Sequence, residues 1–209
     1  MALQPKGLLF DLDNTLVDRD RALAAWLHGL ELSAAVESEA LRLDNSGYKP
    51  PEAVCDFLAG ELGSDAESVW ERMGAGITRN ITADRALLEL LVQLKQSMAI
   101  AVVSNGGGAR QRNKLKAATL DDVFGERVVI SGEVGCEKPS NAIFERGLQA
   151  IGCAAADTVF VGDNLETDIA GANSAGLASI WVARGRRTET TMMTAVVDSV
   201  TDIREVIAS

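Results

Sequence analysis

The chain has 209 residues and a mass of 22.1 kDa, and 47% of its residues are hydrophobic and 24% charged. This composition is typical of a globular protein, and the length suits one well-cored domain with a smaller insertion better than two equal domains. An excess of acidic residues gives a net charge of −10, so the protein repels polyanions and we expect no nucleic-acid partner.

The cysteines and the apolar stretches bear on the compartment. Cys55, Cys136 and Cys153 have neither the even number nor the spacing of a disulfide framework or a zinc site, which favours a reducing compartment. The short apolar run before Asp11 and Asp13 is unlike a secretory signal, and no apolar stretch approaches the roughly 20 residues that cross a bilayer. We expect a cytoplasmic protein without a membrane partner, either a monomer or a homodimer.

Short apolar runs rich in β-branched residues recur along the chain, and each ends in polar or glycine-rich residues, as buried parallel strands do. These predicted strands are Gly7–Phe10, Met98–Val103, Arg127–Ile130, Thr158–Val161 and Ser179–Ala183. Helical apolar stripes lie between or after them, at Leu87, Leu88, Leu91 and Leu94, at Ile143, Phe144, Leu148 and Ile151, and at Val200, Ile203, Val206 and Ile207. Strands that alternate with helices predict an α/β fold with a doubly wound parallel sheet.

One connection is far longer than the others. About 65 residues separate the first strand from the helix that leads to the second, whereas ordinary connections are about 2–6 residues. Helical patterns cover Arg21–Leu43, Pro51–Leu62 and Asp65–Met73, with a break at Tyr48–Pro51. We predict an α/β core of residues 1–16 and 82–209 that carries an inserted, all-helical cap of residues 17–81.

Two carboxylates, Asp11 and Asp13, follow the first predicted strand. Residues two apart in an extended segment project to the same side, so both should lie at the carboxyl end of the sheet, where open α/β sheets bind ligands. Such a pair is tolerated when a cation lies between the carboxylates or when their protonation states differ. The alternative is an acidic turn or helix cap.

Two further segments carry groups that bind anions. Ser104, Asn105 and Gly106 end the second strand and precede a helical pattern at Ala109–Ala118, so a hydroxyl and backbone N–H groups could hold an anion there. The alternative is a simple Asn-Gly turn. Lys138 precedes a proline that keeps it extended, although most such lysines are solvated loop residues.

Acidic residues also follow the fourth predicted strand, at Asp163, Asn164 and Asp168. Magnesium prefers oxygen ligands from one or two carboxylates together with substrate phosphate, so Asp163 and Asp11 are candidate ligands. Asp168 could instead be an acidic residue placed at a helix N-terminus by the helix dipole.

These segments occur in an order that resembles the four motifs of the haloacid dehalogenase superfamily of phosphohydrolases, along nearly the whole chain. The helical insertion lies where the subfamilies with a small helical cap place theirs. The resemblance implies that Asp11 is the nucleophile that forms an aspartyl-phosphate, and that Asp13 protonates the leaving oxygen and then activates water. It also implies that Ser104 and Lys138 bind the phosphoryl oxygens, with backbone N–H groups near Leu12, Asn105 and Gly106.

By the same resemblance, Mg²⁺ is held by Asp11, the carbonyl of Asp13 and Asp163, with Asp168 and Asn164 in support. The physics of phosphoryl transfer agrees, because the reaction mainly requires positioning and charge neutralisation, and a metal ion with a lysine supplies both. The implied partner is a small-molecule phosphate ester.

A carboxylate at Asp13 favours phosphate ester hydrolysis, because superfamily members resembling true dehalogenases lack one there. The segments Asp11–Leu16 and Ser131–Gly135, before Lys138, resemble the branch that contains pyrimidine nucleotidases and N-acylneuraminate 9-phosphatases, which implies a nucleotide or sugar phosphate. Arg19 and Arg21 are candidates for substrate specificity, although charged residues at a helix start usually form a solvated face. A phosphomutase and a non-catalytic binding protein on the same fold are the alternatives.

Overall fold

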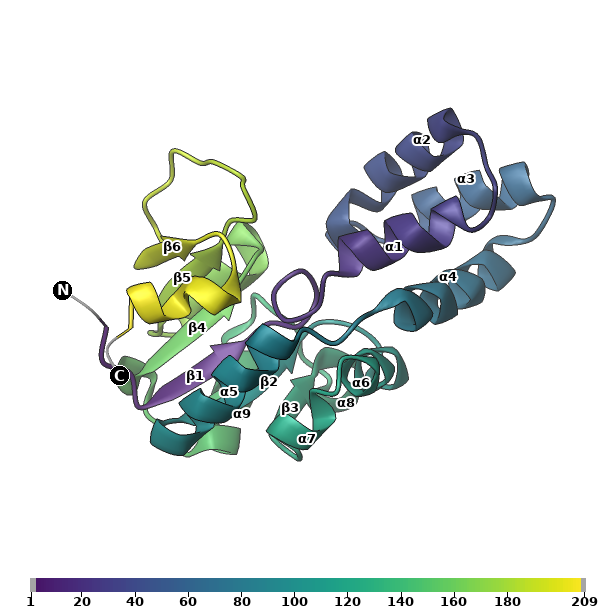
Figure 1. Ribbon diagram of the computed structural model, residues 1–209. Coiled ribbons are helices and arrows are strands. Elements are labelled where there is room, and N and C mark those ends of the chain that lie inside the picture. The colour runs from purple at the N-terminus through teal and green to yellow at the C-terminus, as the bar shows by residue number, and fades with distance from the viewer. Residues whose placement is uncertain (1–2, 208–209) are drawn as a thin grey trace. The chain divides into compact units, whose positions relative to one another are not determined.

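A computed structural model describes residues 3–207 of the chain, which divides into two compact units (Figure 1). The core unit consists of Met1–Val17 and Ala83–Ser209, and the inserted unit consists of Asp18–Thr82. Within the described part of the chain, no helix has the length and apolar character needed to cross a membrane.

The core unit is built on one sheet of six parallel strands in the order β3-β2-β1-β4-β5-β6 (Figure 1). Its strands are β1 (Gly7–Phe10), β2 (Ala99–Ser104), β3 (Val128–Ile130), β4 (Thr158–Gly162), β5 (Ala178–Val182) and β6 (Ala195–Val197). The predicted doubly wound α/β sheet is confirmed, and β6 is an edge strand that the prediction lacked. In the register of the central strands, Phe10 lies beside Val102 of β2 and Val161 of β4, so the chain leaves β1 and β4 at the same edge of the sheet.

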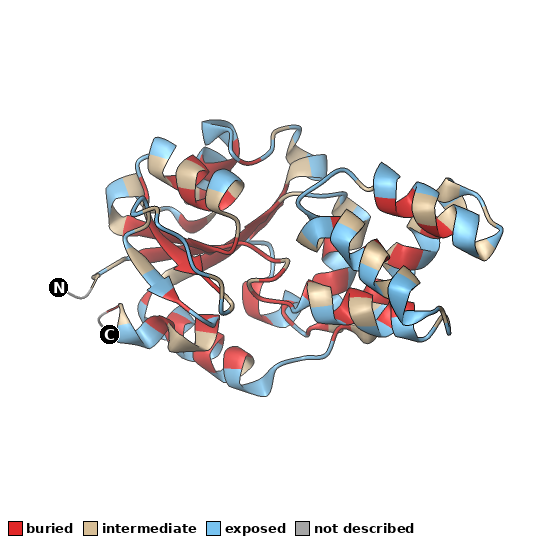
Figure 2. Cartoon of the chain, turned by 90° about the horizontal axis from the view of Figure 1, so that it is seen from above, coloured by how far each residue is buried: buried red, intermediate tan, exposed pale blue. Residues whose placement is uncertain are grey.

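Helices and short helical turns pack on this sheet, and strands β1 to β5 are buried along nearly their whole length, whereas β6 is partly exposed (Figure 2). The helices are α5 (Arg85–Ser97), α6 (Gly108–Ala117), α7 (Asp121–Phe124), α8 (Ser131–Val134), α9 (Asn141–Ile151) and α10 (Gly171–Ser174), and the turns are η2 (Ala155–Asp157), η3 (Leu165–Ala170) and η4 (Val200–Glu205). The predicted closing helix is therefore a short 3₁₀ helix, η4, which buries Val200 and Ile203.

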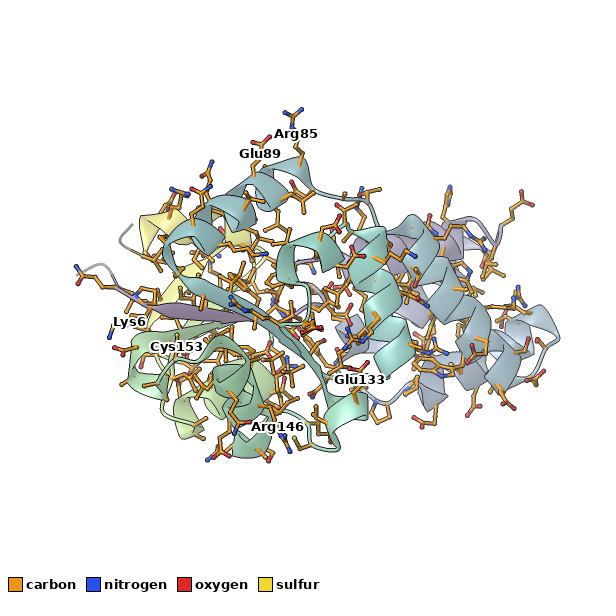
Figure 3. All side chains as sticks on the ribbon, turned by 90° about the horizontal axis from the view of Figure 1, so that it is seen from below. Lys6, Arg85, Glu89, Glu133, Arg146 and Cys153 are labelled. Atoms are coloured by element: carbon orange, nitrogen blue, oxygen red, sulfur yellow. The ribbon has the colours of Figure 1, made fainter. Side chains whose placement is uncertain are left out.

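Alternate side chains of the strands reach different neighbours, as the pleat requires. Leu9 belongs to a buried cluster with Phe144 of α9 and Phe160 of β4, whose rings meet edge to face at 5.1 Å. Phe10, the next residue, packs its ring instead against Phe124 of α7 at 6.2 Å. Away from the sheet, α5 presents its polar face, where Arg85 and Glu89 form an exposed ion pair (Figure 3).

The inserted unit is entirely helical, with α1 (Arg19–His28), α2 (Ala34–Asp44), η1 (Asn45–Gly47), α3 (Glu52–Leu62) and α4 (Ala66–Asn80). The prediction of one helical segment over Arg21–Leu43 is wrong, because α1 ends at His28 and α2 begins after Ser33, whose hydroxyl accepts a hydrogen bond from the N–H of Val36. Helices α1 and α4 pack closely, since a Cβ atom on Gly76 of α4 would overlap the ring of Trp26.

Candidate active site

Three buried carboxylates meet where β1 and β4 end. Asp11 directly follows β1, and its N–H continues the ladder by donating to the carbonyl of Val161 at 2.9 Å. Asp163 follows β4, and Asp168 lies on η3. One carboxylate oxygen from each of the three lies within 4.8 Å of the others, and all three residues are buried. The sheet register thus brings together acidic side chains that lie far apart in the sequence.

The ammonium group of Lys138 lies inside this carboxylate cluster. Its Nζ donates to Oδ1 of Asp11 at 2.5 Å and to Oδ1 of Asp168 at 2.7 Å, and the residue is only 3% exposed. The backbone of Lys138 is fixed by Asn105, whose side-chain amide donates to the Lys138 carbonyl at 2.9 Å and accepts from the Lys138 N–H at 2.8 Å. Lys138 is therefore a buried part of this cluster and not a solvated loop residue.

The electrostatics of the cluster follow from its burial. Burial raises the pKa of Asp11 well above its usual range; Lys138 opposes this effect, and the carboxylates of Asp168 and Asp163 add to it. Burial lowers the pKa of Lys138, but its two carboxylate partners outweigh that effect and the net shift is upward. The three carboxylates face two cations, the ammonium of Lys138 and the guanidinium of Arg186, whose Nη2 lies 3.3 Å from Oδ2 of Asp163, so the cluster carries one excess negative charge when its acids are ionised.

This donor set fits a divalent metal ion. Buried carboxylate oxygens are the ligands that Mg²⁺ prefers, and a divalent cation held by Asp11 and Asp163 would offset the repulsion between the carboxylates. Asp168 has a different role, because its Oδ1 accepts from Lys138 and its Oδ2 accepts from the N–H of Asn164 at 3.0 Å. A Cβ atom on Gly162 would overlap this carboxylate, so only glycine leaves room for it.

Two other groups fix the loop after β4. The side chain of Asn164 caps η3, with its Oδ1 accepting from the N–H groups of Glu166 and Thr167 at 2.9 and 3.0 Å. The carbonyl of Asp163 accepts from Nε1 of Trp181 at 2.9 Å and from Nη2 of Arg186 at 2.7 Å. Sequence reasoning missed Arg186, which lies in a loop after β5 where no spacing relates it to Asp163.

Asp13 lies outside the carboxylate cluster and has partners of its own. Both of its carboxylate oxygens accept from Nζ of Lys114, at 2.8 and 2.6 Å, and its Oδ2 also accepts from Nε2 of Gln111 at 3.0 Å. The same Gln111 nitrogen donates to the hydroxyl of Ser104 at 2.7 Å. The two acids of the first motif therefore have separate ammonium partners, Lys138 for Asp11 and Lys114 for Asp13.

The sequence analysis also did not identify Lys114 and Gln111, although the pattern of polar and apolar residues in this helix points to them. They lie three residues apart on α6 and are buried beside Leu115, so polar residues occupy positions on the inner helix face where apolar ones are expected. The N–H of Gly106 donates to the hydroxyl of Ser131 at 2.9 Å and helps to close the turn, and its role in phosphate binding stays a prediction.

The candidate specificity residues, Arg19 and Arg21, belong to the inserted unit. Arg19 is 7% exposed, and its two terminal nitrogens each donate to Asp44 at 2.7 Å, which joins the start of α1 to the end of α2. The ion pair with Asp44 holds Arg19 within the inserted unit, and a role of Arg19 in substrate specificity stays a prediction. Arg21 remains exposed and donates to the hydroxyl of Thr82.

Comparison with known proteins agrees with this geometry. The family model described as haloacid dehalogenase-like hydrolase matches residues 8–182. The chain is 27% identical to N-acylneuraminate-9-phosphatase of Rattus norvegicus over 85% of this chain and 82% of the relative, and 30% identical to glyceraldehyde 3-phosphate phosphatase of Methanopyrus kandleri over 87% and 85%.

Among solved structures, a magnesium-bound HAD-hydrolase of Bacillus subtilis, YfnB, superimposes with a TM-score of 0.81 at 20% identity, over 98% of this chain and 99% of that one. This likeness concerns the fold alone. The resemblance inferred from the four motifs is confirmed by the family match, which spans the cluster from Asp11 to Asp168. The chain belongs to the haloacid dehalogenase-like hydrolase family.

Proposed function

We propose that this protein is a Mg²⁺-dependent phosphatase that hydrolyses a small phosphorylated metabolite through an aspartyl-phosphate on Asp11. The observation that carries the proposal is the buried contact of Lys138 with Asp11 and Asp168, next to Asp163. A site that holds an ammonium and a divalent cation around one carboxylate suits a phosphoryl group, whose transfer depends on positioning and charge neutralisation. The curated relatives described above are phosphatases, and the chain is accordingly a phosphoric monoester hydrolase of its family.

In the first step, a carboxylate oxygen of Asp11 attacks phosphorus and forms an oxygen–phosphorus bond. Lys138 holds the Asp11 carboxylate in place through a hydrogen bond to its Oδ1. The bond from phosphorus to the ester oxygen breaks, and Asp13 gives its proton to that oxygen, so the alcohol leaves neutral. Lys138 and the hydroxyl of Ser104 bind the phosphoryl oxygens, and bound Mg²⁺ supplies charge neutralisation to the transferring group.

In the second step, Asp13 removes a proton from a water molecule whose oxygen attacks phosphorus. The bond between phosphorus and Asp11 breaks, inorganic phosphate leaves, and the Asp11 carboxylate is restored. Asp13 thus has to act as an acid and then as a base on one side of the phosphoryl group. Its position outside the buried cluster, with a side chain 23% exposed, suits proton exchange with substrate and water.

We propose a nucleotide or sugar phosphate as the substrate class. The relatives described above support the sugar-phosphate part of this choice, because N-acylneuraminate 9-phosphate and glyceraldehyde 3-phosphate are both phosphate esters of sugars. We propose further that the inserted unit, residues 18–82, is the cap that selects among such substrates.

The test is phosphate release from p-nitrophenyl phosphate and from a panel of nucleotide and sugar phosphates, with and without Mg²⁺. We expect release that disappears in excess chelator, returns with Mg²⁺ and is absent in Asp11→Asn. An active Asp11→Asn protein would contradict the nucleophile, and full activity in excess chelator would contradict the metal. Isomerisation of a sugar phosphate without net phosphate release would identify a mutase.

A further inference from the structure

Helix α6 carries two buried polar side chains that both contact Asp13. Lys114 places one ammonium against both carboxylate oxygens, and its side chain is only 9% exposed. Gln111, at 2% exposed, donates from one nitrogen to Asp13 and to Ser104. A buried lysine and a buried glutamine are costly to desolvate, and here both direct their donors at the same carboxylate.

We propose that Lys114 and Gln111 are positioning residues that hold the carboxyl group of Asp13 against the leaving oxygen of the substrate. This inference rests on the proposed function, because it assigns these residues to the proton transfer that Asp13 performs. Two bonds from Lys114 fix the rotation of the carboxyl group, which one bond alone would leave free. Gln111 bridges Asp13 and the hydroxyl of Ser104, which binds the phosphoryl group in the proposed mechanism, and so fixes the distance between them.

The helix that carries these residues is itself anchored to the core unit. On its other side, Arg112 forms two hydrogen bonds of 2.7 Å with Glu133 of α8, whose side chain is marked in Figure 3. Helix α6 begins at Gly108, after the short turn that follows Ser104, the last residue of β2. Side chains of this one helix therefore contact both the proton donor and a phosphate-binding hydroxyl, which limits the relative motion of the two groups.

A positioning role has a kinetic signature that a structural role lacks. Departure of an alkyl alcohol requires protonation of its oxygen, whereas p-nitrophenolate leaves readily without a proton. A misplaced Asp13 therefore slows phosphoryl transfer from alkyl phosphates more than from p-nitrophenyl phosphate. The attack of water on the aspartyl-phosphate is common to all substrates, so this difference is measured in kcat/KM, which includes only the steps through the first transfer.

The experiment compares kcat/KM for p-nitrophenyl phosphate and for the best alkyl phosphate of the panel in the wild type, Lys114→Met, Gln111→Leu and Lys114→Arg. General acid catalysis contributes about 10²–10⁴-fold, so we expect Lys114→Met to lower the alkyl value at least about tenfold more than the aryl value. Lys114→Arg, which keeps the charge and the donors, should restore part of the loss. Lys116→Met is the matched control, because Lys116 is exposed on the same helix, and it should behave as the wild type.

Equal losses on both substrates, or no loss, would overturn the positioning role while leaving the phosphatase intact. If Lys114→Met does not fold, as judged by its circular dichroism, Gln111→Leu decides by the same ratio. A wild-type protein without Asp11-dependent phosphate release would overturn the proposed function itself and this inference with it. The two failures are therefore distinguishable.

Discussion

Replacing Lys138 by Met tests whether this lysine is a required cation at the centre of the site. The substitution keeps the length and most of the packing of the side chain, including its place 5.4 Å from the ring of Phe160, and removes the ammonium between Asp11 and Asp168. Breaking a buried ion pair by removing one partner costs about 3–5 kcal/mol, because the remaining charge is left uncompensated. A chain of this size loses about 2–4 °C of Tm for each kcal/mol, so Tm should fall by about 6–20 °C.

Thermal unfolding followed by circular dichroism measures this loss. The matched control is Lys6→Met, because Lys6 also pairs with an aspartate, Asp157 at 2.9 Å, but with side chains 73% and 42% exposed. An exposed pair contributes little to stability, so the control should unfold close to the wild type. Added Mg²⁺ should recover part of the Tm of Lys138→Met, since the unpaired carboxylates can bind the cation. If Lys138→Met has the same Tm as Lys6→Met and the wild type, the buried ion pairs of Lys138 do not contribute to stability, and the reasoning is refuted.

Three further predictions follow from the described contacts. Gly162→Ala should abolish phosphate release, because the added Cβ overlaps the carboxylate of Asp168; wild-type kcat/KM would show that Asp168 can move without loss. Arg19→Met should lower Tm by roughly 6–20 °C, since it removes the cation that pairs with the buried Asp44. A change in substrate preference at unchanged Tm would show instead that Arg19 acts on the substrate. Millimolar Mg²⁺ should raise the Tm of the wild type but not of Asp163→Asn, and calorimetric titration of the two proteins checks the same binding; equal Mg²⁺ affinities would remove Asp163 from the ligand set.

The fold could be predicted because its strands are buried on both faces. Runs such as Leu8–Phe10 and Val159–Val161 are apolar throughout, and this pattern is typical of parallel strands covered by helices. Strand β6, Ala195–Val197, escaped prediction because it is short and partly exposed at the edge of the sheet. The break between α1 and α2 was not predicted because Leu30 and Leu32 continue the apolar pattern between the two helices. The residues that mark the break are Gly29, which caps the end of α1, and Ser33, which caps the start of α2.

Some residues of the candidate site could be predicted from the sequence and others could not. Asp11 and Asp163 could be named because each follows a strand, and the carboxyl ends of parallel strands share one edge. Lys138 could be named only through the resemblance to the four motifs, because its position before a proline is typical of a solvated loop residue. Lys114 reaches Asp13 across about a hundred residues of sequence, and only tertiary packing determines that contact. The burial of Arg19 could not be predicted either, because its partner, Asp44, lies at the far end of the next helix.

The strand order also governs when the chain can become active during its synthesis. Strand β1 lies between β2 and β4, so the segment that ends in Asp11 is made first but lacks one neighbour until β4 has left the ribosome. Asp163 and Asp168 come directly after β4 in the sequence, so the three carboxylates and Lys138 can assemble only once about four-fifths of the chain has been synthesised. The inserted unit, residues 18–82, has its contacts within one continuous stretch and can form long before. A ribosome-bound chain that stops short of β4 should therefore hold a folded helical unit and no capacity for hydrolysis.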